Sequence, residues 1–395
     1  MPGIGAYALI LAITAGTTFV LTPGVRWLAV RVRAVVLPDE RRVHATPTPT
    51  LGGLAMLGAF LVAMGVASQL AAFDALFEGT SVPLGVVLAA VLIYIVGAID
   101  DLREVSAPAK VAGMVFAASV LYLLGVSLFF FRIPFAGIFI LGPDLAPLVT
   151  VLWVVVMANA VNLIDGLDGL AAGIVAIAAG AFFLYGDRLV NAQILDPGNL
   201  SPLLAVIVLG MCLGFLPHNF HPARIFMGDG GALLLGLLMA ASTMLAGGQT
   251  DDPFSGQTFF FFAPLFIPFF ILGVPIIDTL FAIVRRARTR TGVATADKDH
   301  LHHRLMRLGH GQRRSVVILW LWTALLSGFV LYPTYTGEGD AVIPIAVAAL
   351  GLALYTYFHP GVRRARNAEG ESSVDSPDES ADHTADSPFQ SGTRQ

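Results

Sequence analysis

Eleven apolar segments, each close to the length of a membrane-spanning helix, dominate this sequence. A spanning helix needs roughly 20 predominantly apolar residues. The segments lie at residues 4–25, 51–71, 83–99, 109–130, 146–163, 169–186, 202–217, 231–247, 259–284, 315–333 and 341–358. Charged residues make up only 13% of the chain, about half of the share in a soluble domain. The sequence therefore predicts an all-α polytopic membrane protein with about eleven transmembrane helices.

Basic residues fall almost entirely on one side of these predicted spans. When the loops are numbered alternately, one set holds 21 of the 23 Lys and Arg residues, and the other holds only Arg132 and Arg188. Loops rich in Lys and Arg stay in the cytoplasm. The N-terminus is therefore predicted to lie outside and the C-terminus inside, which agrees with an odd number of spans.

The two ends of the chain differ in character. Residues 1–358 form the predicted transmembrane domain, and no basic segment of the kind that precedes a cleavable signal peptide is evident at the start. Residues 359–395 become rich in Ser and acidic residues, too polar to bury a core, so a disordered cytoplasmic tail is expected. A net charge of −4 gives no reason to expect nucleic acid as a partner, and the single Cys212 excludes a disulfide framework.

Two adjacent carboxylates, Asp100 and Asp101, end the third apolar segment. Neighbouring carboxylates at a membrane boundary repel each other, so the pKa of at least one should rise unless a cation lies near. Lys110, Arg103 or a metal ion could supply that charge. A solvated helix end is the structural alternative.

A second polar segment, NAVNLIDGLDGLAAG, carries a polar residue at every third position: Asn159, Asn162, Asp165 and Asp168. Residues three apart on a helix lie on neighbouring parts of one face, and four such side chains would be costly against lipid. We expect them to line a protein-enclosed cavity, with the adjacent glycines allowing the backbone to turn. A polar seam between helices is the alternative.

The segment HNFHPARIFMGDGG places Asp229 between two glycines, directly before another apolar segment. A carboxylate at this position is well placed to hold a metal ion on a bound phosphate. Free backbone amides at a helix start also attract anions. An ordinary capping carboxylate is the alternative.

The longest predicted cytoplasmic loop contains the sequence HLHHR, formed by His300, Leu301, His302, His303 and Arg304. The three histidines could bind zinc. No Cys accompanies them, however, and the many arginines of the loop favour phosphate recognition, although the positive-inside bias explains some of them. All nine histidines fall in predicted cytoplasmic segments or at span ends, which favours chemistry on that face.

These polar segments would meet at one membrane face and form an interfacial site. Carboxylates that bind metal and cations that bind phosphate are typical of phosphoryl transfer, here to a membrane-embedded acceptor. The chain contains no G-x-x-x-x-G-K-[ST] loop, which excludes a P-loop ATPase.

Five segments, in order, resemble the polyprenyl-phosphate N-acetylhexosamine-1-phosphate transferases, a family that includes the phospho-MurNAc-pentapeptide translocases. They are HATPTPTLGG (44–53), DDLREVSAPAK (100–110), NAVNLIDGLDGLAAG (159–173), FMGDGGALLLG (226–236) and DKDHLHHRL (297–305). The resemblance implies transfer of a sugar 1-phosphate from a UDP-sugar to a polyprenyl phosphate, with release of UMP. It also implies a requirement for Mg²⁺, for which Mn²⁺ is a candidate substitute.

The resemblance further implies roles for individual residues. Asn162 and Asp229 would hold Mg²⁺ on the diphosphate. Asp100 would deprotonate or orient the lipid phosphate, with Asp101 and Lys110 as its charged partners.

Further residues of the motifs would bind the donor. Asp168 would contact uracil, Phe226 would stack on it, Asp165 lies between the two sites, and His44 borders the nucleotide pocket. A closing loop over the diphosphate and sugar would carry His300, His302, His303 and Arg304.

The HLHHR sequence also bears on the sugar. Phospho-MurNAc-pentapeptide translocases have consecutive histidines in this loop, so the pattern here resembles the GlcNAc-1-phosphate branch. We expect UDP-GlcNAc as donor in the first membrane step of a cell-envelope polysaccharide, with UDP-GalNAc as a second candidate. A translocase acting on UDP-MurNAc-pentapeptide for peptidoglycan is the alternative. The expected location is a bacterial plasma membrane with a cytoplasmic active site, and a homodimer is left open.

Two other classes use acidic residues within spans. An intramembrane aspartyl protease needs the motif G-x-G-D, but Phe226 stands at its first glycine. A transporter would place polar residues in the middle of its spans, whereas the acids here gather at one predicted face. Both classes therefore fit the sequence less well than the transferase.

Overall fold

The computed structural model describes residues 2–37, 47–103, 105–128, 130–133, 137–247, 311–336 and 342–358. Several predictions fall outside these ranges. They concern His44, the apolar segment 259–284, the loop residues His300, His302, His303 and Arg304, and the tail 359–395.

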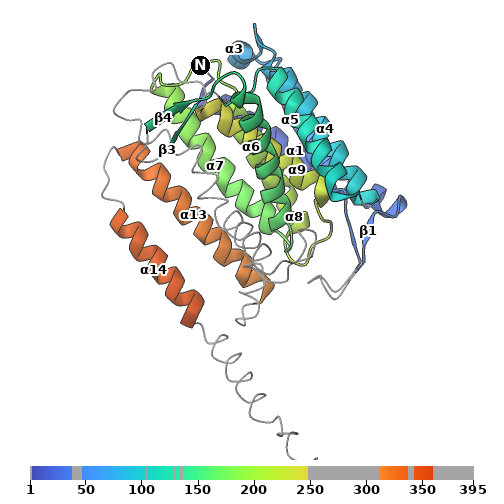
Figure 1. Cartoon of the computed structure of the whole chain (residues 1–395). Helices are drawn as coiled ribbons and strands as arrows, with labels where there is room; N and C mark the ends of the chain where they lie inside the picture. Colours follow the sequence, from blue (N-terminus) through green and yellow to red (C-terminus); the bar gives the residue numbers. More distant parts are fainter. Residues whose placement is uncertain are drawn as a thin grey trace, which may run out of the picture.

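Long apolar helices packed side by side form the body of the protein (Figure 1). In chain order they are α1 (Ile4–Arg31), α2 (Gly53–Ala67), α4 (Val82–Leu102), α5 (Ala107–Leu123), α6 (Leu145–Ile164), α7 (Leu170–Asn191), α8 (Ser201–Asn219), α9 (Gly228–Gly247), α13 (Gln312–Thr336) and α14 (Val342–Phe358). Each of these helices overlaps a predicted span, so the described part of the chain follows the apolar pattern closely.

Six helices in the described ranges are long and apolar enough to cross a membrane. A seventh span would arise if α2 is counted with the short helices η1 (Ala71–Phe73) and α3 (Asp74–Phe77), where the chain bends by 91°. The chain is therefore a polytopic membrane protein. The predicted total of eleven spans and the predicted orientation both stay predictions.

Two short antiparallel strand pairs depart from the all-α prediction. β1 (Val35–Val36) pairs with β2 (Thr48–Pro49), and β3 (Phe130–Ile133) pairs with β4 (Gly137–Ile140). Backbone N–H and C=O groups outside helices still need hydrogen-bond partners, and strand pairing supplies them. The first pair fixes the residues that lead into α2.

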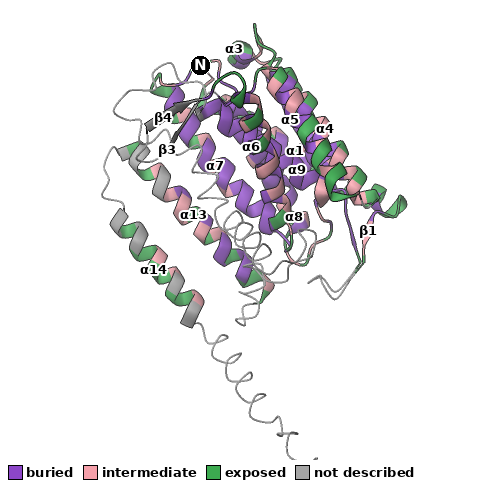
Figure 2. Ribbon diagram, viewed as in Figure 1, coloured by how far each residue is buried: buried purple, intermediate pink, exposed green. Residues whose placement is uncertain are grey.

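Helix α9 lies at the centre of the bundle and is buried along almost its whole length (Figure 2). It packs against α4 and α6 most extensively. In contrast, α1 exposes large apolar side chains, among them Phe19, Val20 and Trp27. Lipid is the expected solvent for such a surface, so apolar exposure there needs no polar cover.

Glycines let two neighbouring helices approach the start of α9 at close range. A Cβ atom added to Gly97 in α4 would lie 2.4 Å from the backbone nitrogen of Gly230. A Cβ atom added to Gly53 in α2 would lie 2.3 Å from the backbone nitrogen of Gly231. No ordinary side chain fits at either position, so these contacts fix where α9 begins relative to α2 and α4.

Candidate active site

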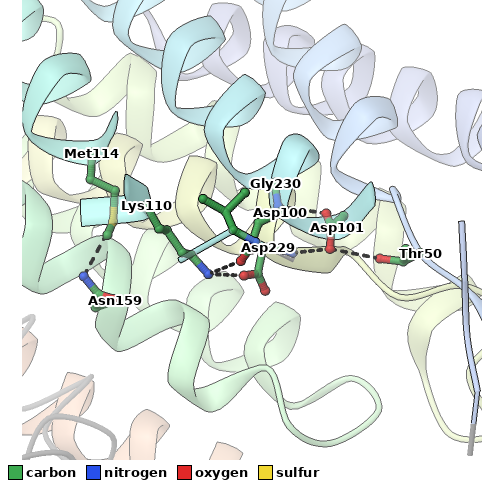
Figure 3. A network of polar contacts seen from close by, with 9 residues as sticks. Thr50, Asp100, Asp101, Lys110, Met114, Asn159, Asp229 and Gly230 are labelled. Atoms are coloured by element: carbon green, nitrogen blue, oxygen red, sulfur yellow. Dashed lines mark hydrogen bonds and ion pairs between the residues drawn. The ribbon is translucent and has the colours of Figure 1, made fainter. Parts of the chain in front are cut away.

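Lys110 lies at the centre of a polar cluster formed by the ends of several helices (Figure 3). Its ammonium group donates a hydrogen bond to Oδ2 of Asp100 across 2.9 Å and pairs with Oδ2 of Asp229. Asp100 lies in the last turn of α4, Lys110 in the first turn of α5 and Asp229 in the first turn of α9. Lys110, one of the three candidate cations named from the sequence, therefore pairs with Asp100.

Asn162, near the end of α6, completes this cluster. With its amide nitrogen directed at Asp229, it donates to Oδ1 across 3.0 Å, and its amide oxygen accepts from Nζ of Lys110 across 3.2 Å. This orientation satisfies both ends of the amide, which is how such groups are assigned. Four helices thus contribute one polar side chain each to a single cluster.

Asp101 points away from Lys110 and toward the start of α9. Its Oδ1 accepts the backbone N–H of Asp229 across 2.9 Å, and its Oδ2 accepts the backbone N–H of Gly230 across 3.1 Å. Thr50 donates its hydroxyl to Oδ1 of Asp101 at 3.4 Å. The two adjacent acids therefore have different surroundings, although the resemblance named Asp101 as a charged partner of Asp100.

Asp165 follows the last residue of α6 and lies near several other acids. Burial raises the pKa of its carboxyl well above the usual range. The negative charges of Asp229, Asp101 and Asp168 raise that pKa further. A cation placed among these groups would lower the pKa again, so this part of the cluster favours a positively charged ligand.

Asp168 lies in the turn between α6 and α7 and is buried, with 7% of its side chain exposed. Its Oδ2 contacts Nδ1 of His221 at 2.7 Å and accepts the backbone N–H of Ala223 across 3.1 Å. Gly169, at φ +75°, then begins the next helix, as the predicted turn requires. The carboxylate of Asp168 thus holds the loop that precedes α9.

The polar residues Asn159, Asn162, Asp165 and Asp168 do not share one continuous helix. Because α6 ends at Ile164, only Asn159 and Asn162 are helical. Asn159 donates to the carbonyl of Val155 in its own helix and contacts the sulfur of Met114. The four residues therefore do not form the predicted single polar face. Asn162 belongs to the Lys110 cluster, whereas Asp168 binds the loop that contains His221.

Phe226 is held by its backbone at the edge of this region. Its N–H donates to the carbonyl of Pro49, and its carbonyl accepts from the N–H of Gly52, both across 2.9 Å. The segments around residues 49–53 and 226–227 therefore pair with each other, although they lie far apart in sequence. The predicted stacking of Phe226 on a base stays a prediction.

Three polar residues that shape this region were not predicted from the sequence: Thr50, Asn219 and His221. Asn219 accepts the N–H of Gly169 and donates to the carbonyl of Ile225, both across 3.0 Å. All three lie within segments that the motifs had already singled out. The available signal was a polar residue close to a proline: Thr50 follows Pro49, His221 precedes Pro222, and Asn219 lies two residues after Pro217.

The donor atoms of the Lys110 cluster fit a magnesium ion that is bound together with phosphate. Within the described ranges, no three His, Cys, Asp or Glu side chains form a metal site of their own. Magnesium typically takes one or two protein carboxylates, with water and phosphate oxygens completing its coordination. Asp229 keeps 31% of its side chain exposed, so its oxygens are within reach of a ligand.

The residues of the Lys110 cluster lie within a segment that matches a known protein family. Residues 83–247 match the family described as glycosyl transferase family 4. The chain is 39% identical over 362 residues to the decaprenyl-phosphate N-acetylglucosaminephosphotransferase of Mycolicibacterium smegmatis, which spans 90% of this chain and 89% of that protein.

Two further relatives have related names. A Bacillus subtilis protein named probable undecaprenyl-phosphate N-acetylglucosaminyl 1-phosphate transferase is 38% identical over 309 residues, or 77% of this chain and 78% of that protein. A phospho-N-acetylmuramoyl-pentapeptide-transferase of Desulforudis audaxviator is 33% identical over 300 residues, or 71% of this chain and 82% of that protein. These matches confirm the resemblance inferred from the motifs.

Proposed function

The chain belongs to glycosyl transferase family 4, and from this membership we propose that it transfers N-acetylglucosamine 1-phosphate from UDP-N-acetylglucosamine to a polyprenyl phosphate. The products are UMP and polyprenyl-diphospho-N-acetylglucosamine. The enzyme class, a glycosyl-1-phosphate transferase, follows from the family. The donor, the metal and the membrane side are proposals.

The convergence of Asp100, Lys110, Asn162 and Asp229 carries this proposal. Two carboxylates, one cation and one amide meet where four apolar helices begin or end. A lipid acceptor can reach such a site from the bilayer and a soluble nucleotide donor from the water. Phosphoryl transfer needs mainly positioning and neutralisation of charge, and this set of side chains suits both.

N-acetylglucosamine is the sugar that the relatives favour. Two relatives at 38–39% identity have N-acetylglucosamine in their names, whereas the N-acetylmuramoyl-pentapeptide enzyme is 33% identical and covers less of this chain. The donor prediction from the HLHHR sequence points the same way. We therefore retain UDP-N-acetylglucosamine as the donor.

Asp229 and Asn162 are the residues that would hold Mg²⁺, with Mn²⁺ as a candidate substitute. Bound magnesium would neutralise charge on the diphosphate as UMP departs. Lys110 pairs with the carboxylates of Asp100 and Asp229 and would limit their repulsion of an incoming phosphate. Oxygen donors on two different helices leave the remaining coordination positions to substrate and water.

The favoured reaction is direct attack by the lipid phosphate. An oxygen of the lipid phosphate forms a bond to the β-phosphorus of the donor, and the bond from that phosphorus to the bridging oxygen breaks. The bridging oxygen leaves with UMP. A phosphate monoester has a second pKa of about 6, so the acceptor is largely ionised at neutral pH. Asp100 would therefore act more through orientation than through proton removal.

Location and assembly follow from the same reasoning. The strong bias of Lys and Arg toward one set of loops supports a cytoplasmic active site in a bacterial plasma membrane. The product would begin a lipid-linked cell-envelope polysaccharide. A homodimer is compatible with the exposed apolar helix faces but is not required by the cluster.

Competition between donors tests the proposal. Purified protein with undecaprenyl or decaprenyl phosphate receives UDP-N-acetylglucosamine, UDP-N-acetylgalactosamine and UDP-MurNAc-pentapeptide at equal concentrations. We expect lipid-linked N-acetylglucosamine as the main product, because a site built for one sugar discriminates strongly against others. Preference for the pentapeptide donor would assign the chain to peptidoglycan synthesis instead.

A further inference from the structure

We propose that Asp101 is a positioning residue that fixes the start of α9, and that it takes no part in proton transfer. This inference rests on the proposed function, because it concerns how the metal-binding Asp229 is held. It gives a new role to Asp101, which the resemblance named only as a charged partner of Asp100. The hydrogen-bond partners of the two Asp101 carboxylate oxygens support this role.

Both oxygens of Asp101 are occupied by groups of the protein. The backbone N–H groups of Asp229 and Gly230 lie 2.9 Å and 3.1 Å from Oδ1 and Oδ2, respectively. The first N–H groups of a helix have no partner within that helix, and a carboxylate there is favoured by the helix dipole. Asp101 thus caps the N-terminus of α9, although it belongs to a different helix, α4.

This arrangement corrects one expectation from the sequence. The amides at the start of α9 were expected to be free to attract a substrate anion, but Asp101 occupies two of them. Neutralisation of the substrate phosphates would therefore depend on other groups, namely Lys110 and a metal ion if Asp229 holds one. The Asp101 carboxylate also cannot approach a substrate proton without breaking its hydrogen bonds to the start of α9.

Helix geometry explains why the two acids differ. Consecutive residues on an α-helix point about 100° apart. Asp100 is directed toward α5, where it meets Lys110, and Asp101 toward α9 (Figure 3). One turn of α4 therefore joins the reactive cluster to the helix start that carries Asp229.

The side chains around the cap lie close to the backbone of Gly228. A Cβ atom at Gly228, where φ is +71°, would lie 2.4 Å from Oδ2 of Asp101 and 2.5 Å from Oγ1 of Thr50. Thr50 is buried, and its N–H donates to the carbonyl of Ala34 across 2.9 Å. The next residue, Leu51, has φ +76°. Residues other than glycine rarely adopt this backbone conformation, and it persists only where the surrounding structure supports it.

Asp229 links the cap to the reaction. Its N–H is the group that Asp101 holds, and its carboxyl pairs with Lys110. A shift of the α9 start therefore moves a metal-binding oxygen. Loss of a residue that orients a metal ligand typically costs about 10- to 100-fold in metal affinity or activity.

The test compares Asp101→Asn with the unaltered protein by two measurements. The first is the affinity for Mn²⁺, measured by paramagnetic resonance on purified protein without substrate. The second is the Mg²⁺ concentration at half-maximal transfer. We expect both to weaken about 10-fold or more, with the donor KM unchanged and much of kcat restored at high Mg²⁺. We also expect the pH profile of kcat to keep its shape.

Thr50→Val provides a graded second variant, because it removes only the weaker contact to Oδ1. We expect a smaller loss of Mn²⁺ affinity in the same direction. Asp196→Asn is the matched control: Asp196 also accepts a backbone N–H, that of Gly198, but it lies in the loop before α8, at the far end of the bundle. It should leave both measurements unchanged.

Two results would overturn the inference. One is normal Mn²⁺ affinity in folded Asp101→Asn together with loss of kcat at every Mg²⁺ concentration and loss of the acidic limb of the pH profile, which identifies a proton-transferring acid. The other is normal Mn²⁺ affinity in Thr50→Val if Asp101→Asn does not fold. Because Mn²⁺ binding is measured without substrate, a wrong proposed function would appear separately, as failure of the unaltered protein to transfer the sugar phosphate.

Discussion

Nδ1 of His221 lies 2.7 Å from Oδ2 of Asp168, and this contact joins the turn after α6 to the loop before α9. The carbonyl of His221 also accepts a hydrogen bond from Nε of Arg313 at the start of α13, across 3.2 Å. Trp320 in α13 donates to the carbonyl of Leu170 at 3.4 Å. One histidine therefore connects three segments beside the candidate site.

Replacement of His221 tests this connection. His221→Ala leaves a buried carboxylate with one partner fewer, and an unsatisfied buried polar group costs about 1–3 kcal/mol. We expect a lower midpoint of thermal unfolding in detergent. His221→Asn can still present an N–H to Asp168 and should recover most of the loss. Equal midpoints for all three proteins would mean that the contact contributes nothing.

Lys110→Met removes the cation that lies between Asp100 and Asp229. Transfer should fall by about 100-fold or more, on the scale of a lost preorganised charge in an active site. Mg²⁺ should then stabilise the folded variant more than it stabilises the unaltered protein, because a metal ion can replace the missing cation beside the two carboxylates. We expect a larger Mg²⁺-dependent rise in the unfolding midpoint than in the unaltered protein, while Lys110→Arg should respond as the unaltered protein does.

Asp229→Asn and Asn162→Ala test the metal assignment. Each should lower kcat by about 100- to 1,000-fold, because a preorganised electrostatic contact in an active site has that typical value. Folding should be preserved, as judged by gel filtration and the unfolding midpoint. Asn191→Ala is the control, since Asn191 pairs with Asp187 near the other end of α7. Near-normal turnover by Asp229→Asn in Mg²⁺ would remove Asp229 from the metal site.

The order of bond changes separates the direct route from a two-step route. With direct attack, UMP should form only when a polyprenyl phosphate is present. Rapid mixing of enzyme with labelled UDP-N-acetylglucosamine, with and without lipid, measures this. A burst of UMP without lipid, or a labelled adduct on Asp100 or Asp229, would instead establish a covalent intermediate.

Gly97→Ala tests the close approach of α4 to α9. The added methyl group would lie 2.4 Å from the backbone nitrogen of Gly230, so the helices must separate. Overpacking of this kind costs about 1–3 kcal/mol, and activity should fall with it because Asp100 and Asp101 follow on the same helix. Gly65→Ala, in α2, meets open space and should change stability by less than about 1 kcal/mol.

Much of the described fold could be predicted from local sequence. In the described ranges each predicted apolar run overlaps a helix, because a long apolar run is stable as a helix in lipid wherever it lies in the chain. The pairing of Lys110 with Asp100 could also be predicted in part. The two adjacent carboxylates and the candidate cations near them lie in one short segment of the sequence. The pair of β1 and β2 was not predictable in this way, since Val35 and Pro49 meet only through a non-local contact.

The sequence by itself determined which side chains are available at the bundle end: Asp100, Asp101, Lys110, Asn162 and Asp229 stand at the ends of apolar runs, and burial in lipid would be too costly for them. Only the tertiary structure decided what each one does. The rotation of α4 about its own axis, set by glycine contacts with α9, turns Asp100 toward Lys110 and Asp101 toward the backbone of Asp229. That rotation depends on how two distant segments pack, and no local pattern of residues encodes it.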